Sequence, residues 1–137
     1  MEQYLNNTKY ERCPCCGYYT IKHKGSFEIC YLCDWEDDGQ NDSNADRITG
    51  GPNGDYSLTE ARKNFTKYLI MYQPSDIEHY LEHTIEIRKK KHVIMYLHEL
   101  INKGIKDVNT TQLLNSLASQ VSNSSERIYN NWIHISD

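Results

Sequence analysis

All five cysteines of the 137-residue chain lie in two short clusters between positions 13 and 33. The first cluster is Cys13-Pro-Cys-Cys-Gly17 and the second is Cys30-Tyr-Leu-Cys-Asp34. In each cluster two cysteines are three residues apart, so a tight turn can direct both thiolates at one ion while its backbone N–H groups donate to the sulfurs. This spacing predicts one metal site per chain, with zinc as the favoured ion and iron as the alternative; its ligands are Cys13, Cys16, Cys30 and Cys33.

The predicted site is structural, because four cysteine ligands leave no open coordination position on a tetrahedral ion. Structural zinc contributes an apparent free energy on the order of 10–16 kcal/mol in small peptides. We expect the fifth cysteine, Cys15, to lie at the exposed tip of the first turn. The alternatives are that Cys15 is an alternate metal ligand or a redox-sensitive thiol. An odd number of clustered cysteines also favours metal thiolates in a reducing compartment over disulfides.

The elements that must position these thiols can be predicted from the residues around them. Thirteen residues separate Cys16 from Cys30, and loose alternation from Tyr18 to Ile29 around a Lys24-Gly25 turn predicts a short β-hairpin. Both cysteine clusters would then meet at its open end. Residues 34–55, rich in Gly, Asn and Asp, are expected to form a loop, with Trp35 packed over the metal site.

Helical patterns follow this loop. The capping-box sequence Ser57-Leu-Thr-Glu60 predicts a helix that runs to about Tyr72, and Ser75-Asp-Ile-Glu78 predicts another that runs to Gly104. Because the apolar stripe of the second helix changes phase, we expect a kink or break near residues 89–91. Two further short helices are expected over residues 111–121 and 125–133.

These elements predict an α+β fold, in which a small zinc-ribbon hairpin with an acidic loop precedes an α-helical C-terminal part. Residues 1–73 would form the zinc-binding module with one helix, and residues 74–137 a helical extension packed on it. The chain has neither a basic start followed by an apolar run nor a stretch of roughly 18 apolar residues, so we expect a cytoplasmic protein.

Charge is unevenly distributed, because residues 34–55 contain seven carboxylates and a single arginine. Binding of zinc by four thiols would add further negative charge nearby, so duplex nucleic acid is not the expected partner of this end. A solvated loop or a cation site are alternative interpretations of the acidic segment. We predict that it docks a basic protein through Glu36, Asp37, Asp38, Asp42 and Asp46.

Four linked motifs together resemble the bacterial cysteine-rich CPCC family over about residues 10–72. They are Cys13-Pro-Cys-Cys-Gly-Tyr-Tyr-Thr20, Glu28-Ile-Cys-Tyr-Leu-Cys-Asp-Trp-Glu-Asp-Asp38, Gly50-Gly-Pro-Asn53 and Ser57-Leu-Thr-Glu-Ala-Arg-Lys-Asn-Phe65. The resemblance implies a small zinc-ribbon-like module with the four cysteines in the ligand positions. Some members look like parts of toxin-immunity loci, which implies an immunity or antitoxin role. Tyr31 and Asp34 depart from the family pattern.

Two further motifs are compatible with other functions. His79-Tyr-Leu-Glu82-His83 matches the H-x-x-E-H pattern of inverted zinc metallopeptidases, although we expect an ordinary helix surface there. Residues 88–91, Arg-Lys-Lys-Lys, are expected to form a solvated turn, with phosphate contact as the alternative. The predicted function is therefore a non-enzymatic zinc-binding interaction module. The first alternative is a zinc-ribbon nucleic-acid regulator acting through residues 88–92, and the second is a metal-dependent hydrolase.

Overall fold

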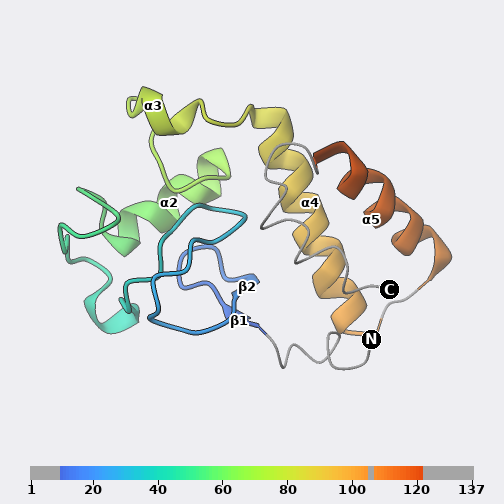
Figure 1. Ribbon diagram of the computed structural model, residues 1–137, viewed down its shortest axis with the longest axis horizontal. Coiled ribbons are helices and arrows are strands. Elements are labelled where there is room, and N and C mark those ends of the chain that lie inside the picture. Colours follow the sequence, from blue (N-terminus) through green and yellow to red (C-terminus); the bar gives the residue numbers. More distant parts are fainter. Residues whose placement is uncertain (1–9, 105–106, 122–137) are drawn as a thin grey trace.

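The computed structural model describes residues 10–104 and 107–121 (Figure 1). Two short strands and a long irregular segment precede the helices, which confirms the α+β architecture. In the view of Figure 1, α4 lies between the strand and loop region and α5. The elements are β1 (Glu11–Arg12), β2 (Tyr19–Ile21), the 3-10 helix η1 (Asp42–Asn44), α2 (Leu58–Tyr68), α3 (Ile77–Tyr80), α4 (Ile85–Asn102) and α5 (Val108–Val121).

The β-hairpin surrounds the first cysteine cluster and does not separate the two clusters. Strand β1 pairs with β2 in antiparallel fashion, with Glu11 opposite Ile21 and Arg12 opposite Tyr19. The prediction of a hairpin from Tyr18 to Ile29 is therefore wrong. Each cysteine turn reverses the chain by itself, so extended segments flank each turn; around the second turn a single bridge joins Ile29 to Glu36.

Helix α2 begins where its capping residue predicts and ends earlier than expected. The Ser57 hydroxyl accepts a hydrogen bond from the Glu60 N–H at 3.0 Å, which satisfies one of the free donors of the first turn. The helix ends when Leu69 adopts a left-handed conformation with φ of 61°. The carbonyl of Met71 then accepts from the Asn64 side chain at 2.8 Å, which holds the chain against the helix it has just left.

The second helical region is interrupted at residues 81–84. Helix α3 is a single turn, and α4 starts afresh because the Thr84 hydroxyl accepts from the Ile87 N–H at 3.2 Å. Helix α4 continues through residues 89–91, so the prediction of a kink there is wrong. The apolar stripe of residues 77–85 lies on the surface, with Ile77 64% and Leu81 67% exposed. Burial therefore does not hold these residues in one continuous helix.

The C-terminal predictions are confirmed as far as the structure describes them. Gly104, with φ of 98°, follows the end of α4 as the expected stop. Helix α5 covers the expected 111–121 segment and starts three residues earlier, with the Asp107 carboxylate accepting from the Thr110 N–H at 2.7 Å. The helix expected over 125–133 lies outside the described residues.

Two of the four basic residues 88–91 are buried, so the prediction of a solvated turn is wrong for them. Arg88 is 3% exposed and donates to three backbone carbonyls. Lys91 is 2% exposed, and its ammonium lies 4.7 Å from the centroid of the Tyr31 ring. Lys91 therefore faces the second cysteine turn, whereas Arg88 faces the ends of α2 and α3.

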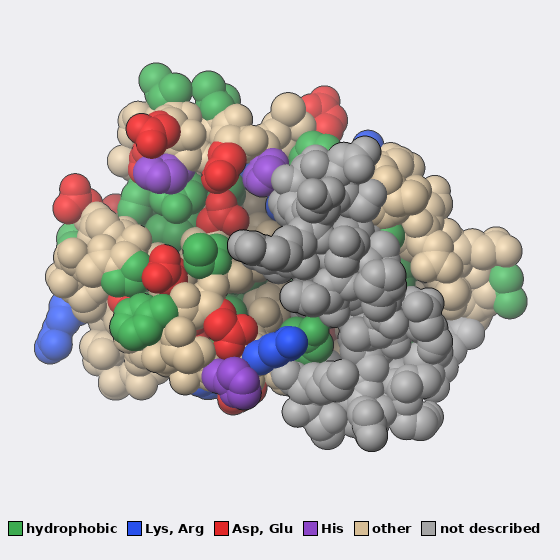
Figure 2. Space-filling view, viewed as in Figure 1, with side chains coloured by type: hydrophobic (Ala, Val, Ile, Leu, Met, Phe, Trp, Pro, Cys, Tyr) green, Lys and Arg blue, Asp and Glu red, His purple; other side chains and the backbone are tan. Residues whose placement is uncertain are grey.

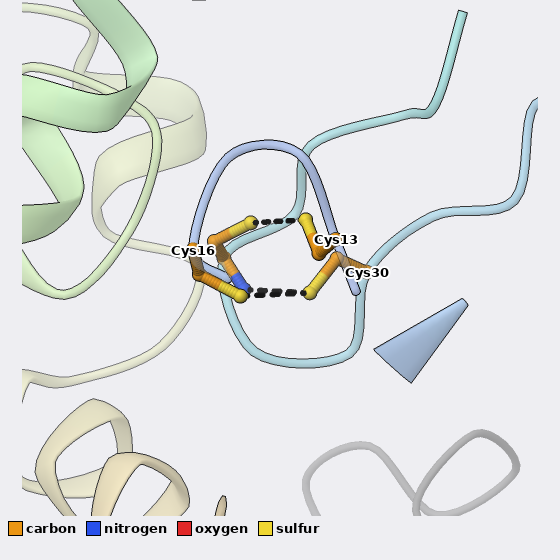
Figure 3. A group of neighbouring side chains, drawn as sticks. Cys13, Cys16 and Cys30 are labelled. Carbon is orange, nitrogen blue, oxygen red and sulfur yellow. Dashed lines mark hydrogen bonds between the residues drawn. The ribbon is translucent and has the colours of Figure 1, made fainter. Parts of the chain in front are cut away.

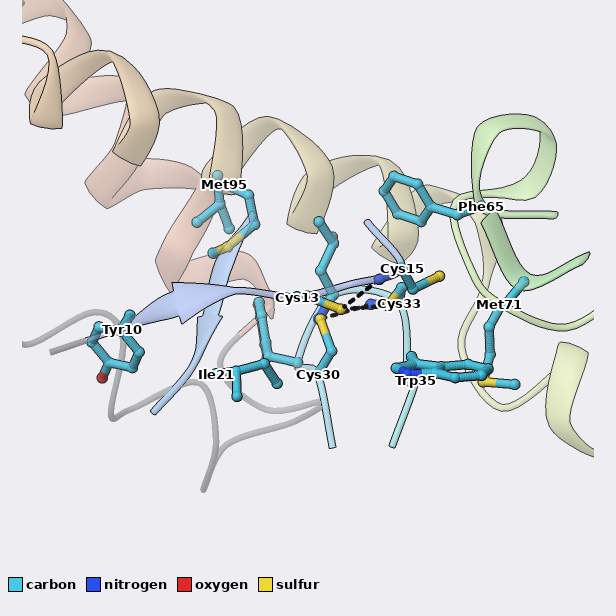
Figure 4. Packing of buried hydrophobic residues seen from close by; sticks show 14 of the residues in the cluster. Tyr10, Cys13, Cys15, Ile21, Cys30, Cys33, Trp35, Phe65, Met71 and Met95 are labelled. Carbon is cyan, nitrogen blue, oxygen red and sulfur yellow. Dashed lines mark hydrogen bonds between the residues drawn. The ribbon is translucent and has the colours of Figure 1, made fainter. Parts of the chain in front are cut away.

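A single hydrophobic cluster joins the cysteine region to the helices. It contains residues from the first strand region, both cysteine clusters, α2, α4 and α5, so members come from both sides of position 73. Figure 4 shows Met95 of α4 facing the two strands, near Ile21 of β2 and Cys13, which directly follows β1. The division into residues 1–73 and 74–137 remains a prediction. No helix in the described part of the chain is long and apolar enough to cross a membrane.

Candidate metal centre

The two cysteine turns share one backbone hydrogen-bond pattern. In each, the N–H of the first cysteine donates to a carbonyl five residues ahead, at 2.8 Å for Cys13 and 2.9 Å for Cys30. The residue four positions ahead donates back to the cysteine carbonyl, at 2.9 Å for Gly17 and 3.0 Å for Asp34. Both of these residues have positive φ, 84° and 71°. Asp34 thus takes the conformation that glycine takes in the first turn, as aspartate can at modest cost.

The four predicted ligand sulfurs converge on one point. Sulfur atoms of Cys13, Cys16, Cys30 and Cys33 all lie within 4.8 Å of one another. The Cys13 and Cys33 sulfurs are 3.6 Å apart and the Cys16 and Cys30 sulfurs 3.7 Å apart (Figure 3). A tetrahedral ion with metal–sulfur bonds of about 2.3 Å requires sulfur separations of about 3.8 Å. These four side chains could therefore hold one metal ion.

Hydrogen bonds to the sulfurs support the same arrangement. The N–H of Cys15 donates to the Cys13 sulfur at 3.4 Å, and the N–H of Leu32 donates to the Cys30 sulfur at 3.3 Å. These equivalent bonds distribute thiolate charge over the turns. The buried Thr20 hydroxyl lies 3.0 Å from the Cys30 sulfur. Sequence reasoning missed Thr20, although it lies in the strand directly after the first turn.

The electrostatics of the isolated thiols favour a single thiolate. Burial alone would raise the pKa of Cys30, but hydrogen bonds from the other three cysteines and from Thr20 hold it well below its usual value. Burial, with hydrogen bonds from neighbouring cysteines, raises the pKa of Cys16 and of Cys33 well above the usual value. A bound divalent cation supplies the positive charge that full deprotonation needs, so metal binding releases protons.

Cys15 is buried, contrary to the expectation of an exposed tip. It is 8% exposed and lies beside Phe65 of α2 (Figure 4). Helix α2 covers the first turn, and the Arg62 Nε donates to the Pro14 carbonyl at 2.9 Å. Cys15 is not among the four cysteines whose sulfurs converge. Its environment is that of a small core residue.

Trp35 directly follows the second turn and is fully buried, as expected, whereas its packing over the metal site stays a prediction. Its ring lies beside Met71 (Figure 4). The Met71 N–H donates to the Cys33 carbonyl at 2.9 Å. The second turn is thereby attached to the segment that follows α2.

A family model described as "Cysteine-rich CPCC" matches residues 11–83, more than half of the chain. The chain belongs to the cysteine-rich CPCC family. The match contains all four converging cysteines and reaches beyond the expected residue 72 to include α3. Comparisons with curated proteins and with solved structures found no match.

Within the CPCC region the acidic segment is held together by its own carboxylates. Asp37 is 2% exposed, and its two oxygens accept from the Gly25 N–H at 2.7 Å and the Gly39 N–H at 3.2 Å. Asp38 accepts from the Gln40 N–H at 3.0 Å. The prediction that Asp37 contacts a partner is wrong, because its carboxylate is buried against the backbone.

The other predicted docking residues are accessible, but several have partners in the chain. Asp42 forms an ion pair with Arg62 at 2.7 Å, and Asp46 accepts from the Thr59 hydroxyl. Glu36 is half-buried, and its backbone pairs with the Asn53 side chain. Burial raises the pKa of Asp34 to about 7, against the opposing influence of Lys91. The segment therefore presents less negative charge than its composition indicates.

We expect Asp37→Asn to destabilise the CPCC module by about 1–3 kcal/mol, because an amide cannot accept both backbone N–H bonds through equivalent oxygens. The matched control is Asp42→Asn, which removes one exposed ion pair and should change the free energy of unfolding by less than about 1 kcal/mol. Urea denaturation of the metal-bound protein measures both. Equal effects of the two substitutions would show that Asp37 does not hold the loop.

The H-x-x-E-H residues do not share a helix. His79 is in the single turn of α3, whereas Glu82 and His83 lie in the break after it. The His79 Nδ1 lies 3.1 Å from an Asp76 oxygen, and its ring stacks on Tyr72 at 4.6 Å. Within residues 10–104 and 107–121, the four cysteines are the group of three or more potential ligands that meets around one point. The two histidines are not brought together in the way that a peptidase helix requires.

Proposed function

We propose that this CPCC-family chain is a non-enzymatic protein-interaction module built around one structural zinc ion. The convergence of four thiols from two matching turns carries this proposal. Cys13, Cys30 and Cys33 are almost completely buried, so an ion that they hold with Cys16 is closed to substrates. Zinc is the proposed ion because it accepts four thiolates in a tetrahedron and needs no redox chemistry.

The absence of enzymatic activity is supported by the place of the alternative ligands. His79 pairs with Asp76, and His83 lies outside α3. We expect the double variant His79→Ala, His83→Ala to retain one zinc per chain, because binding by four thiols uses neither ring. Elemental analysis of purified wild-type and variant protein is the measurement. Loss of half the metal, or peptidase activity that the double substitution abolishes, would favour the hydrolase interpretation instead.

The proposed partner is a basic protein, such as a toxin that binds nucleic acid and is occluded by this chain. Support comes from the accessible carboxylates of the acidic segment and from the burial of Arg88 and Lys91. Because these two cations are inside the protein, the charged side chains of residues 88–92 that a phosphate group could contact are mainly those of Lys89 and Lys90. A basic partner is steered by negative charge, and this attraction weakens as salt rises.

The partner proposal is tested with the basic product of a neighbouring reading frame as the purified probe. The quadruple variant Glu36→Gln, Asp38→Asn, Asp42→Asn, Asp46→Asn should slow association about tenfold at low salt and less near 0.15 M. Lys63→Gln with Lys67→Gln, on exposed positions of α2, is the control and should not slow it. Salt-sensitive binding of duplex DNA or RNA, without binding of the basic protein, would support the nucleic-acid alternative.

A further inference from the structure

A cavity of about 430 Å³ lies away from the cysteines, between residues 52–56, the first turn of α2 and residues 72–79. Its volume falls in the range of about 300–1,000 Å³ that is usual for ligand pockets. The side chains used below all line it: Asp55, Tyr56, Glu60, Tyr72, Asp76 and His79.

The charge of the cavity wall is negative. Three carboxylates line it, and neither lysine nor arginine is among the described residues that do so. Asp76 is engaged by the Tyr56 hydroxyl and by His79, each at 3.1 Å. Asp55 and Glu60 are exposed and form no ion pair within the described residues. Two carboxylates are thus available to a cation that enters.

Aromatic rings form another part of the wall. Tyr56 and Tyr72 meet edge to face with centroids 5.6 Å apart, and His79 stacks on Tyr72. Burial raises the pKa of Tyr72, and the carboxylates of Asp34, Glu82 and Asp76 raise it further. These contributions indicate negative potential at the ring. Figure 2 shows acidic and histidine side chains beside hydrophobic ones over α3, with no lysine or arginine visible among them.

A guanidinium group matches this combination better than an ammonium. It is planar and weakly hydrated, it can stack on aromatic rings, and it presents several donors to carboxylates at once. The chain itself places guanidinium carbons over tyrosine rings, with Arg12 4.4 Å from the Tyr19 centroid and Arg88 4.5 Å from the Tyr80 centroid. Ile77 directly follows the lining residue Asp76 in the chain and is exposed, so it offers apolar surface to residues flanking such an arginine.

We propose that this acidic, tyrosine-lined cavity receives an arginine side chain of the basic partner protein. Asp55 and Glu60 accept hydrogen bonds from the guanidinium, and the aromatic rings contact its plane. This inference rests on the proposed function, because it assigns the docking point of that partner. It places the docking point beside α3, away from the Asp37 region of the acidic segment.

The probe is the peptide acetyl-Gly-Arg-Gly-amide, titrated into the zinc-loaded full chain and followed by backbone NMR shifts. We expect saturable shifts at Tyr56, Tyr72 and His79, and at least tenfold weaker binding to Asp55→Asn, Glu60→Gln. The control variant Glu11→Gln, Glu86→Gln, whose exposed carboxylates lie outside both the cavity and the predicted docking residues, should bind as the wild type does. Thermal melts check that all variants are folded.

Two further titrations test whether the charge of the ligand is required and whether the ligand belongs to a protein or is a small molecule. The citrulline peptide has the same shape without the charge, and equal binding of it would overturn the assignment. Free arginine lacks the flanking peptide residues that can contact the exposed surface of Ile77, so it should bind more weakly than the peptide. If it bound as tightly, a small-molecule site would replace the partner site.

Binding of the partner protein distinguishes a failure of this inference from a failure of the proposed function. If the partner binds the Asp55→Asn, Glu60→Gln variant as tightly as the wild type, the inference is wrong and the proposed function stands. If no basic protein binds the chain at all, the proposed function fails, and the cavity is not a partner site even if the peptide occupies it. Loss of partner binding in the cavity variant, with the control unaffected, supports both.

Discussion

Cys30→Ser is expected to abolish metal binding and to unfold the CPCC region. Cys30 is fully buried, and its sulfur accepts from the N–H groups of Leu32 and Cys33 besides its contact with Thr20. Three remaining thiols cannot close a tetrahedral shell. The apparent free energy of structural zinc, on the order of 10–16 kcal/mol in peptides, is comparable to the stability of about 5–15 kcal/mol typical of a whole domain.

The measurements for Cys30→Ser are metal content per chain and circular dichroism with and without a chelator. Wild-type protein should contain one zinc and be colourless, and the variant should resemble the chelated wild type. The matched control is Cys15→Ala, which leaves the four ligands intact. Alanine is chosen because Cys15 is buried, and serine would place a hydroxyl in the core. Two zinc ions per chain, a red iron-bound protein, or metal loss in the control would contradict the proposed site.

Arg88→Met is expected to be the most damaging substitution outside the cysteine turns. The Arg88 guanidinium donates to the carbonyls of Tyr68, Tyr80 and His83 at 2.9, 2.7 and 2.9 Å. The Tyr68 and Tyr80 carbonyls lie at the ends of α2 and α3, where helix carbonyls lack internal partners, and the His83 carbonyl lies in the irregular segment before α4. Each buried acceptor left unsatisfied costs about 1–3 kcal/mol, so the loss should be about 3 kcal/mol or more.

Urea denaturation of the zinc-bound protein measures the effect of Arg88→Met. Lys89→Met makes the same kind of change at the next position, which is exposed, and should alter stability by no more than about 0.5 kcal/mol. Arg88→Lys should recover little, because one ammonium cannot reproduce the fork that spans three carbonyls. A change of under 1 kcal/mol in Arg88→Met would show that these bonds do not join the helices.

Local signals in the sequence predicted much of this structure. Cysteine spacing predicted the four side chains that converge, and Ser57 predicted the start of α2, because each depends on residues close together in the chain. The same holds for Gly104, whose positive φ ends α4. Asp34, which departs from the family pattern, has a φ of 71° and so takes the same left-handed conformation as Gly17 in the first turn.

Features that depend on distant contacts could not be predicted in this way. Asp37 is buried because the backbone at Gly25, twelve residues away, supplies a hydrogen bond to its carboxylate. Arg88 is buried because it meets the end of α2, twenty residues away. In both cases the residue type indicated solvent, and tertiary contacts decided otherwise. The sequence predicted a break near residues 89–91, whereas the structure has it at residues 81–84. The prediction followed the phase of the apolar stripe, but part of that stripe lies on the surface.

The bond from the Met71 N–H to the Cys33 carbonyl joins the metal site to a residue thirty-eight positions later. Met71 is fully buried, and its own carbonyl is held by Asn64 of α2. Opening of the second cysteine turn therefore also releases the chain beyond α2, and the two parts form one cooperative unit. Hydrogen exchange at the Met71 amide consequently reports the opening of the cysteine site, although Met71 is not one of its ligands.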